Sequence, residues 1–208
     1  MKISPLDRIL LLLTGLLAAY QVVVGIDGLE DVPTIAYTIG FGVLLVAVLL
    51  IIILGFEVLD SPPVVIVSTI IPLSLSLGLI WEHVESWRIP YLCFTIIGFL
   101  AVIITRSFPI PGRLPTFVLA IVHGVAGMVL FLLPSILAAN GTTSPGFALV
   151  GLGGALIGLG GLLLSFLKAG KPILPRETIL RIKRLEAVMV ASAGGTIALL
   201  ATIALKVS

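Results

Sequence analysis

The chain alternates long apolar stretches with short polar gaps. The apolar stretches cover residues 9–26, 34–56, 62–81, 89–105, 114–138, 146–167 and 187–205. Each is close to the roughly 20 residues that an α-helix needs to cross about 30 Å of hydrocarbon. Strands of a membrane barrel are shorter, at about ten residues, and alternate in polarity. The pattern therefore predicts an all-α, polytopic integral membrane protein: a bundle of seven transmembrane helices.

Composition agrees with lipid as the main solvent. Of the 208 residues, 59% are hydrophobic and 11% are charged, whereas soluble domains carry about 25% charged residues. This length allows one compact bundle, so we interpret residues 1–208 as a single transmembrane domain. A net charge of +2 gives no reason to expect a nucleic-acid partner.

The basic residues predict the orientation of the bundle. Ten of the twelve fall before the first stretch, between the fourth and fifth, or between the sixth and seventh: Lys2, Arg8, Arg106, Arg113, Lys168, Lys171, Arg176, Arg181, Lys183 and Arg184. Arg88 and Lys206 are the two exceptions. Because Lys and Arg collect in cytoplasmic gaps, we expect the N-terminus inside and the C-terminus outside. This partition requires an odd number of spans and predicts a multi-pass protein of the cell membrane.

The longest gap covers residues 168–186, and its segment 176–186 predicts a short helix at the inner membrane surface. Its cations Arg181, Lys183 and Arg184 can hold anionic lipid headgroups, at about 1 kcal/mol per charge. The simpler alternative is that they only fix the topology.

Small residues in the last two stretches indicate close helix packing. Gly154 and Gly158 form a G-x-x-x-G pair, and Ala191 and Gly195 repeat the spacing. In lipid, such residues let helix backbones approach each other. We expect these two spans to pack tightly, together or against a partner chain, in a homo-oligomer or a larger membrane complex. The alternative is a pathway lined by exposed backbone.

The third stretch carries a polar stripe. Ser68, Pro72, Ser76 and His83 recur at intervals of four or seven residues and so share a helix face. Pro72 cannot donate to the carbonyl of Ser68, and a freed carbonyl at that depth needs a protein or water partner. The stripe predicts a polar path toward the outer surface. The alternative is a kinked packing helix whose serines bond to their own backbone.

His123 is the ionisable residue that lies deepest in a predicted span. Ionisable side chains at this depth are candidates for a functional site, here a proton relay, a metal ligand or a haem ligand. The alternative is a neutral imidazole bonded across a helix interface. A haem held by both His123 and His83 is disfavoured, because the two lie about 15 Å apart in depth at about 1.5 Å per residue.

Acidic residues gather in the predicted outer gaps. Asp27, Asp31, Glu82 and Glu85 can converge there, together with Glu30. Clusters of carboxylate oxygens suit hard cations such as Ca²⁺ or Mg²⁺. The alternative is that these acids are simply solvated at the ends of the spans.

No catalytic or cofactor-binding motif stands out, and the sequence assigns no cofactor. We therefore expect a non-enzymatic role, as a small transporter or channel or as a membrane-embedded subunit of a larger complex. The alternative is a membrane enzyme or a redox subunit, binding haem or a metal, that uses His123.

Overall fold

The computed structural model describes residues 5–25, 28–55, 58 and 61–155. These residues form helices and connecting turns, with no strand among them, so the prediction of an all-α protein is confirmed for this part of the chain. The helices are α1 (Pro5–Val24), α2 (Asp31–Leu54), α3 (Pro62–His83), η2 (Glu85–Trp87), α4 (Arg88–Ser107), α5 (Leu114–Ala139) and η3 (Pro145–Phe147). A helical segment continues from η3 to Ala155.

Four helical segments are long and apolar enough to cross a membrane: Asp31–Leu54, Pro62–His83, Glu85–Ser107 and Leu114–Ala139. The segments Arg8–Val24 and Pro145–Ala155 are shorter apolar helices. Each of the first five predicted stretches coincides with a helix, α1 to α5. The sixth stretch continues past the described residues and the seventh lies wholly outside them, so the number seven and the orientation stay predictions.

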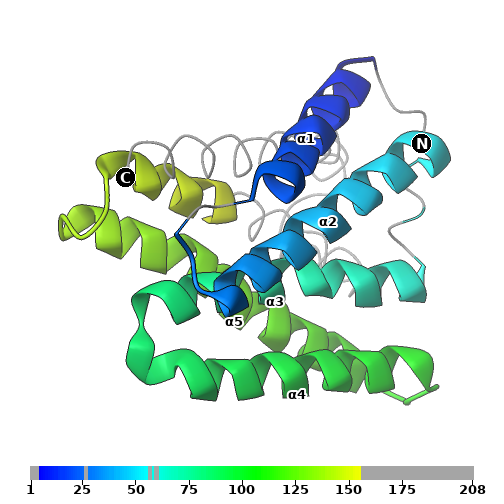
Figure 1. The fold of residues 1–208 in the computed structure, drawn as a ribbon. Coiled ribbons are helices and arrows are strands. Elements are labelled where there is room, and N and C mark those ends of the chain that lie inside the picture. The colour runs from blue at the N-terminus through cyan, green and yellow to red at the C-terminus, as the bar shows by residue number, and fades with distance from the viewer. Residues whose placement is uncertain (1–4, 26–27, 56–57, 59–60, 156–208) are drawn as a thin grey trace, which may run out of the picture.

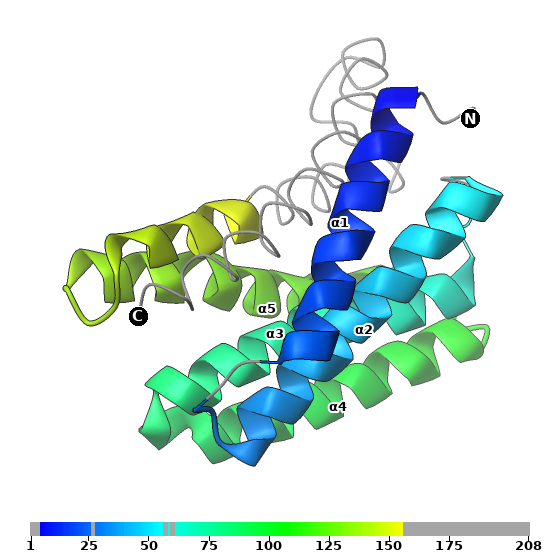
Figure 2. The ribbon, with the colours of Figure 1, turned by 45° about the horizontal axis from the view of Figure 1, so that its top comes forward.

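Consecutive helices run in opposite directions, and α3 lies at the centre of the bundle (Figure 1). It packs against α2, α4 and α5, whereas α1 packs mainly on α2 (Figure 2). The connections after α1, α3 and α5 lie toward one end of the bundle, and those after α2 and α4 lie toward the other (Figure 1). We call the first of these ends the α3–α4 end.

The second half of α3 is buried on every side. All residues from 73 to 80 are buried, although a helix on the outside of a bundle would expose one face. Glycines at the α2–α3 interface permit this close approach. A Cβ on Gly40 would lie 2.8 Å from Ser74 Oγ, and one on Gly78 would lie 2.6 Å from Tyr37 Cε1. Helix α3 is therefore the packing core of the bundle.

The segment Pro145–Ala155 contacts α5 at its backbone. A Cβ on Gly154 would lie 2.9 Å from the backbone of Leu130, and one on Gly151 would lie 2.6 Å from the carbonyl oxygen of Phe131. Close backbone approach at small residues is typical of helix packing in lipid. Gly154 thus contacts α5, while Gly158, Ala191 and Gly195 lie outside the described residues.

Candidate functional site

The α3–α4 turn places an arginine against a tryptophan. Helix α3 ends at His83 because Val84 leaves the helical conformation, with φ −136° and ψ 75°. The chain turns through η2 and enters α4 at Arg88. Arg88 Nε donates to the carbonyl oxygen of Trp81 at 2.6 Å, and its guanidinium carbon lies 5.7 Å from the centre of the Trp81 ring. Arg88 thereby donates a hydrogen bond to a carbonyl in the last turn of α3, where carbonyl oxygens lack an N–H donor from the same helix.

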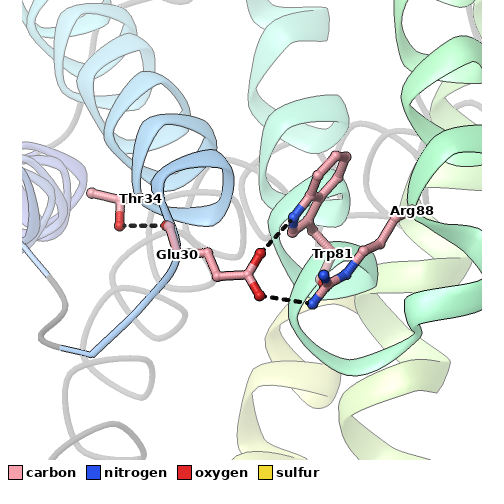
Figure 3. Close-up of polar contacts among 4 residues, drawn as sticks. All are labelled: Glu30, Thr34, Trp81 and Arg88. Atoms are coloured by element: carbon pink, nitrogen blue, oxygen red, sulfur yellow. Dashed lines mark hydrogen bonds and ion pairs between the residues drawn. The ribbon is translucent and has the colours of Figure 1, made fainter.

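Glu30 joins this turn to the start of α2 (Figure 3). Its carboxylate accepts hydrogen bonds from Trp81 Nε1 and from Arg88 Nη2, both at 3.1 Å. Glu30 is the N-cap residue of α2, yet its side chain makes no capping bond because it reaches across to α3 and α4. Thr34 Oγ1 donates to the Glu30 carbonyl oxygen at 3.0 Å. One carboxylate therefore links three helices at the α3–α4 end.

A second carboxylate, Glu82, lies between a phenol and an imidazole. Gly78 leaves space for the Tyr37 ring, and the Tyr37 hydroxyl donates to Glu82 Oε2 at 3.4 Å. His83 Nε2 lies 3.8 Å from the same oxygen and has no hydrogen-bond partner among the described residues. The His83 ring also meets Phe147 of η3 edge-on, with centroids 5.5 Å apart.

We call these six residues the end cluster: Glu30, Tyr37, Trp81, Glu82, His83 and Arg88. Tyr37 also lines a small pocket between α1 and α2, together with Gln21, Gly25, Thr34, Thr38 and Phe41. The pocket has room for about one water molecule. The end cluster therefore combines the ion pair of Glu30 and Arg88 with a phenol, a carboxylate and an imidazole that lie next to one another.

The predicted metal site receives no support from the described residues. No group of three or more His, Cys, Asp or Glu side chains in this part of the chain is close enough to hold a metal ion. Glu82 contacts Tyr37 and His83 instead, and Glu85 is exposed on η2. Asp31 begins α2, and Asp27 lies outside the described residues. A cation held by these acids stays a prediction.

The hydroxyls of the predicted polar path bond to their own helix. Ser68 Oγ donates to the Val65 carbonyl at 3.0 Å, and Ser76 Oγ donates to the Pro72 carbonyl at 2.6 Å. Ser76 is fully buried and accepts a hydrogen bond from the Tyr91 hydroxyl of α4 at 2.8 Å. These are the bonds that the packing alternative predicts. His83 belongs to the end cluster, about one turn beyond the buried part of α3.

The predicted functional histidine, His123, lies on α5. Its Nδ1 atom is buried and has no hydrogen-bond partner within the described ranges. The backbone of Leu119, one turn earlier on α5, and Arg106 of α4 both act on its ring electrostatically. A Cβ on Gly124 or Gly127 would meet nothing within 4 Å, so the space beside His123 is open. His83 contacts Phe147 at the α3–α4 end, which gives no support to one iron bound by both histidines.

Sequence reasoning missed three members of the end cluster. Arg88 counted only as an exception to the charge rule, yet it is paired with Glu30 at the same end. Tyr37 and Trp81 were not selected, because nothing in a single sequence shows which helices meet. The available signal was the placement of Trp81 and Arg88 on either side of one short turn. The lipid-binding candidates Arg181, Lys183 and Arg184 lie outside the described residues.

Comparisons with protein-family models, with curated proteins and with solved structures find no match for this chain.

Proposed function

We propose that this chain is a multi-pass protein of the cell membrane, with seven spans, a cytoplasmic N-terminus and an external C-terminus. Four long apolar helical segments support membrane insertion. The charge partition supports the orientation.

A reporter fused after Lys206 tests both the orientation and the count. We expect the reporter to be active outside the cytoplasm. A cytoplasmic reporter on a folded, membrane-inserted protein would reject the proposed topology, because it requires either an even number of spans or an external N-terminus.

We further propose a non-catalytic role as a membrane-embedded subunit of a larger complex. The observation that carries this proposal is the solid packing of the central helix. Residues 73–80 of α3 are buried on all sides, and the hydroxyls of Ser68, Ser74 and Ser76 donate to carbonyls of the same helix. A helix whose polar groups are used internally fits a structural role better than a permeation path.

Purification from native membranes tests the subunit role. A tag at either terminus should recover the same partner proteins in fixed ratio, in two detergents of different harshness. Crosslinking in intact membranes before solubilisation should retain those partners. A chain that runs as a single species or as a homo-oligomer under all of these conditions would contradict the proposal.

The end cluster favours a small transporter or channel as the second candidate. Tyr37 lies between a small pocket and Glu82, with His83 beyond it, so a phenol, a carboxylate and an imidazole follow one another at the α3–α4 end. The purified protein in liposomes should then carry protons or a small cation. Glu82→Gln should abolish that flux, whereas Glu85→Gln, an exposed neighbour on η2, should not.

A redox or enzymatic role that uses His123 is the alternative. The buried Nδ1 atom of His123, which meets no hydrogen-bond criterion among the described residues, supports it. A haem bound through this histidine would give the purified protein a Soret band that is lost in His123→Phe. If the protein lacks a Soret band when purified from its native membranes, the haem form of this alternative is excluded.

A further inference from the structure

The segment Pro145–Ala155 forms a helical hairpin with α5. Residues 140–144 connect the two, and the amides of Thr142 and Thr143 donate to the Leu137 carbonyl oxygen at 2.9 and 3.3 Å, which fixes the turn. Connections of about five residues or fewer join antiparallel helices. The segment accordingly lies beside α5 (Figure 1).

The contacts between the two helices define their register. A Cβ on Gly151 would lie 2.6 Å from the Phe131 carbonyl oxygen and would also meet Ser135. A Cβ on Gly154 would lie 2.9 Å from the backbone of Leu130. Each step forward along the segment thus moves the contact backward along α5. The interface lies on the face of α5 that carries Phe131 and Ser135.

The same face of α5 is bare in the turns before Phe131. Ala120, Gly124 and Gly127 precede Phe131 at steps of three or four residues, so they share its face. A Cβ on Gly124 or Gly127 would meet nothing within 4 Å among the described residues, and Ala120 and Gly124 are exposed. We call these three residues the bare face. It directly continues the interface with Pro145–Ala155.

The sequence after Ala155, which lies outside the described residues, carries small residues at matching positions. Gly158, Gly161 and Ser165 follow Gly154 at steps of three or four residues, so on a continuous helix they share its face. The predicted sixth span extends to residue 167. An antiparallel helix of that length is long enough to cover the bare face.

We propose that residues 156–167 cover the bare face as the continuation of the sixth span. With the register of the described contacts, Gly158 meets Gly127 and Ser165 meets Ala120. Small residues on both sides let two backbones approach, which is how helices associate in lipid. The small residues of both helices are then used within one chain. This inference rests on the sixth span of the proposed topology, but not on the subunit or transporter role.

Disulfide crosslinking of the full chain in membranes tests the contact. In a Cys93→Ala background, which removes the one native thiol, the pair Gly127→Cys and Gly158→Cys should form an intrachain disulfide on oxidation. Such a bond needs Cα atoms about 4.4–6.8 Å apart. Mass spectrometry of the linked peptides identifies it. Gly127→Cys with Leu156→Cys, on the opposite side of the proposed helix, should give no link.

The pair Ala120→Cys and Ser165→Cys tests the same register with smaller changes, because each replaces one small side chain with another. If the first pair fails to insert, this pair decides the matter. A short bismaleimide replaces the oxidant here, since packed helices cross at an angle and diverge from their closest point. Ala120→Cys with Leu163→Cys is the control. Resistance to alkaline extraction checks separately that each variant is inserted in the membrane.

Thermal unfolding in detergent provides a second readout whose sign depends on whether the face is covered. Gly127→Leu should lower the melting temperature by about 2–10 °C, because a large side chain overpacks a close helix contact. On a bare helix facing lipid the same change should raise it, since leucine has a higher helix propensity than glycine. Gly127→Ala should be tolerated, because alanine is itself a small residue of such interfaces.

The crosslinks also show what else could cover the face. A disulfide between two chains in Gly127→Cys would overturn the proposal and assign the face to a second copy. A link of Gly127→Cys to Ala191→Cys in place of Gly158→Cys would assign it to the seventh predicted span. The absence of any intrachain link in an inserted protein would reject the contact, and a raised melting temperature in Gly127→Leu would then assign the face to lipid.

Discussion

At the scale of single residues, small side chains set how closely two helices of the bundle approach each other. Gly78 is the clearest case, because the Tyr37 ring occupies the place where its side chain would be. That contact brings the Tyr37 hydroxyl to Glu82. A residue without a side chain therefore positions one half of the end cluster.

We expect Gly78→Ala to destabilise the protein by about 1–3 kcal/mol, the usual cost of overpacking a tight interface. The new Cβ would lie 2.6 Å from Tyr37 Cε1, so the ring must move. Thermal unfolding in detergent measures the loss. Gly124→Ala is the matched control, since its Cβ meets nothing within 4 Å; it should be neutral or stabilising by up to about 1 kcal/mol. Equal losses in the two variants would show that the Tyr37 contact is not the cause.

The hydrogen bond from Tyr91 to Ser76 is the second residue-scale test. Both residues are buried, and the bond joins α4 to α3. A double-mutant cycle of Tyr91→Phe and Ser76→Ala should give a coupling energy of about 0.5–1.5 kcal/mol. Zero coupling would mean that the two hydroxyls are satisfied independently.

At the scale of elements, the carboxylate of Glu30 joins the start of α2 to the α3–α4 turn, which is distant from it in the sequence. Glu30 precedes α2, whereas Trp81 and Arg88 flank the α3–α4 turn. The link is partly solvated, because the side chain of Glu30 is 60% exposed and that of Arg88 is 26% exposed. Its contribution to stability is therefore modest and depends on salt.

We expect a double-mutant cycle of Glu30→Gln and Arg88→Gln to give about 0.2–1 kcal/mol of coupling at low salt. The coupling should shrink at about 1 M salt, where the Debye length falls to about 3 Å. Chemical denaturation with urea measures it, since urea adds no charge. Glu85→Gln, on an exposed acid of the same turn, should show no coupling to Arg88→Gln. A coupling that persists in high salt would indicate a desolvated pair and contradict the partly exposed geometry.

At the scale of the whole molecule, the connections alternate between the two ends of the bundle. The turn at residues 84–87 lies at the same end as the loop before α2, because Glu30 contacts both Trp81 and Arg88. The connection between α4 and α5 lies at the opposite end (Figure 1). If the bundle crosses a membrane, these two turns must face different compartments.

Accessibility of single cysteines tests this arrangement. In a Cys93→Ala background, which removes the one native thiol, Ser86→Cys should react with an impermeant maleimide added outside intact cells. Ser107→Cys should react only after the cells are permeabilised. Reversed labelling would invert the predicted orientation, and labelling of both positions from one side would reject an odd number of crossings between them.

Much of the fold could be predicted, because one apolar stretch of membrane-spanning length encodes one helix. The ranges 62–81 and 114–138 differ from α3 and α5 by only one or two residues at their C-terminal ends. The partners of individual side chains could not be predicted. Ser76 shares a face with Pro72 and His83 in the sequence, yet its partner across the helices is Tyr91 on α4.

The local pattern of hydrophobic residues was sufficient to predict that the chain forms apolar helices and to place the ends of the first five within four residues of those observed, since hydrophobicity and helix length are local properties. The sequence also predicted an orientation, through the spacing of cations. The contacts between helices were needed to show that α3 is central, that its serines donate to carbonyls of the same helix and that Arg88 is paired with Glu30. These outcomes depend on which helix faces meet, and that is decided by contacts between residues far apart in the chain, such as Gly78 with Tyr37 and Arg88 with Glu30.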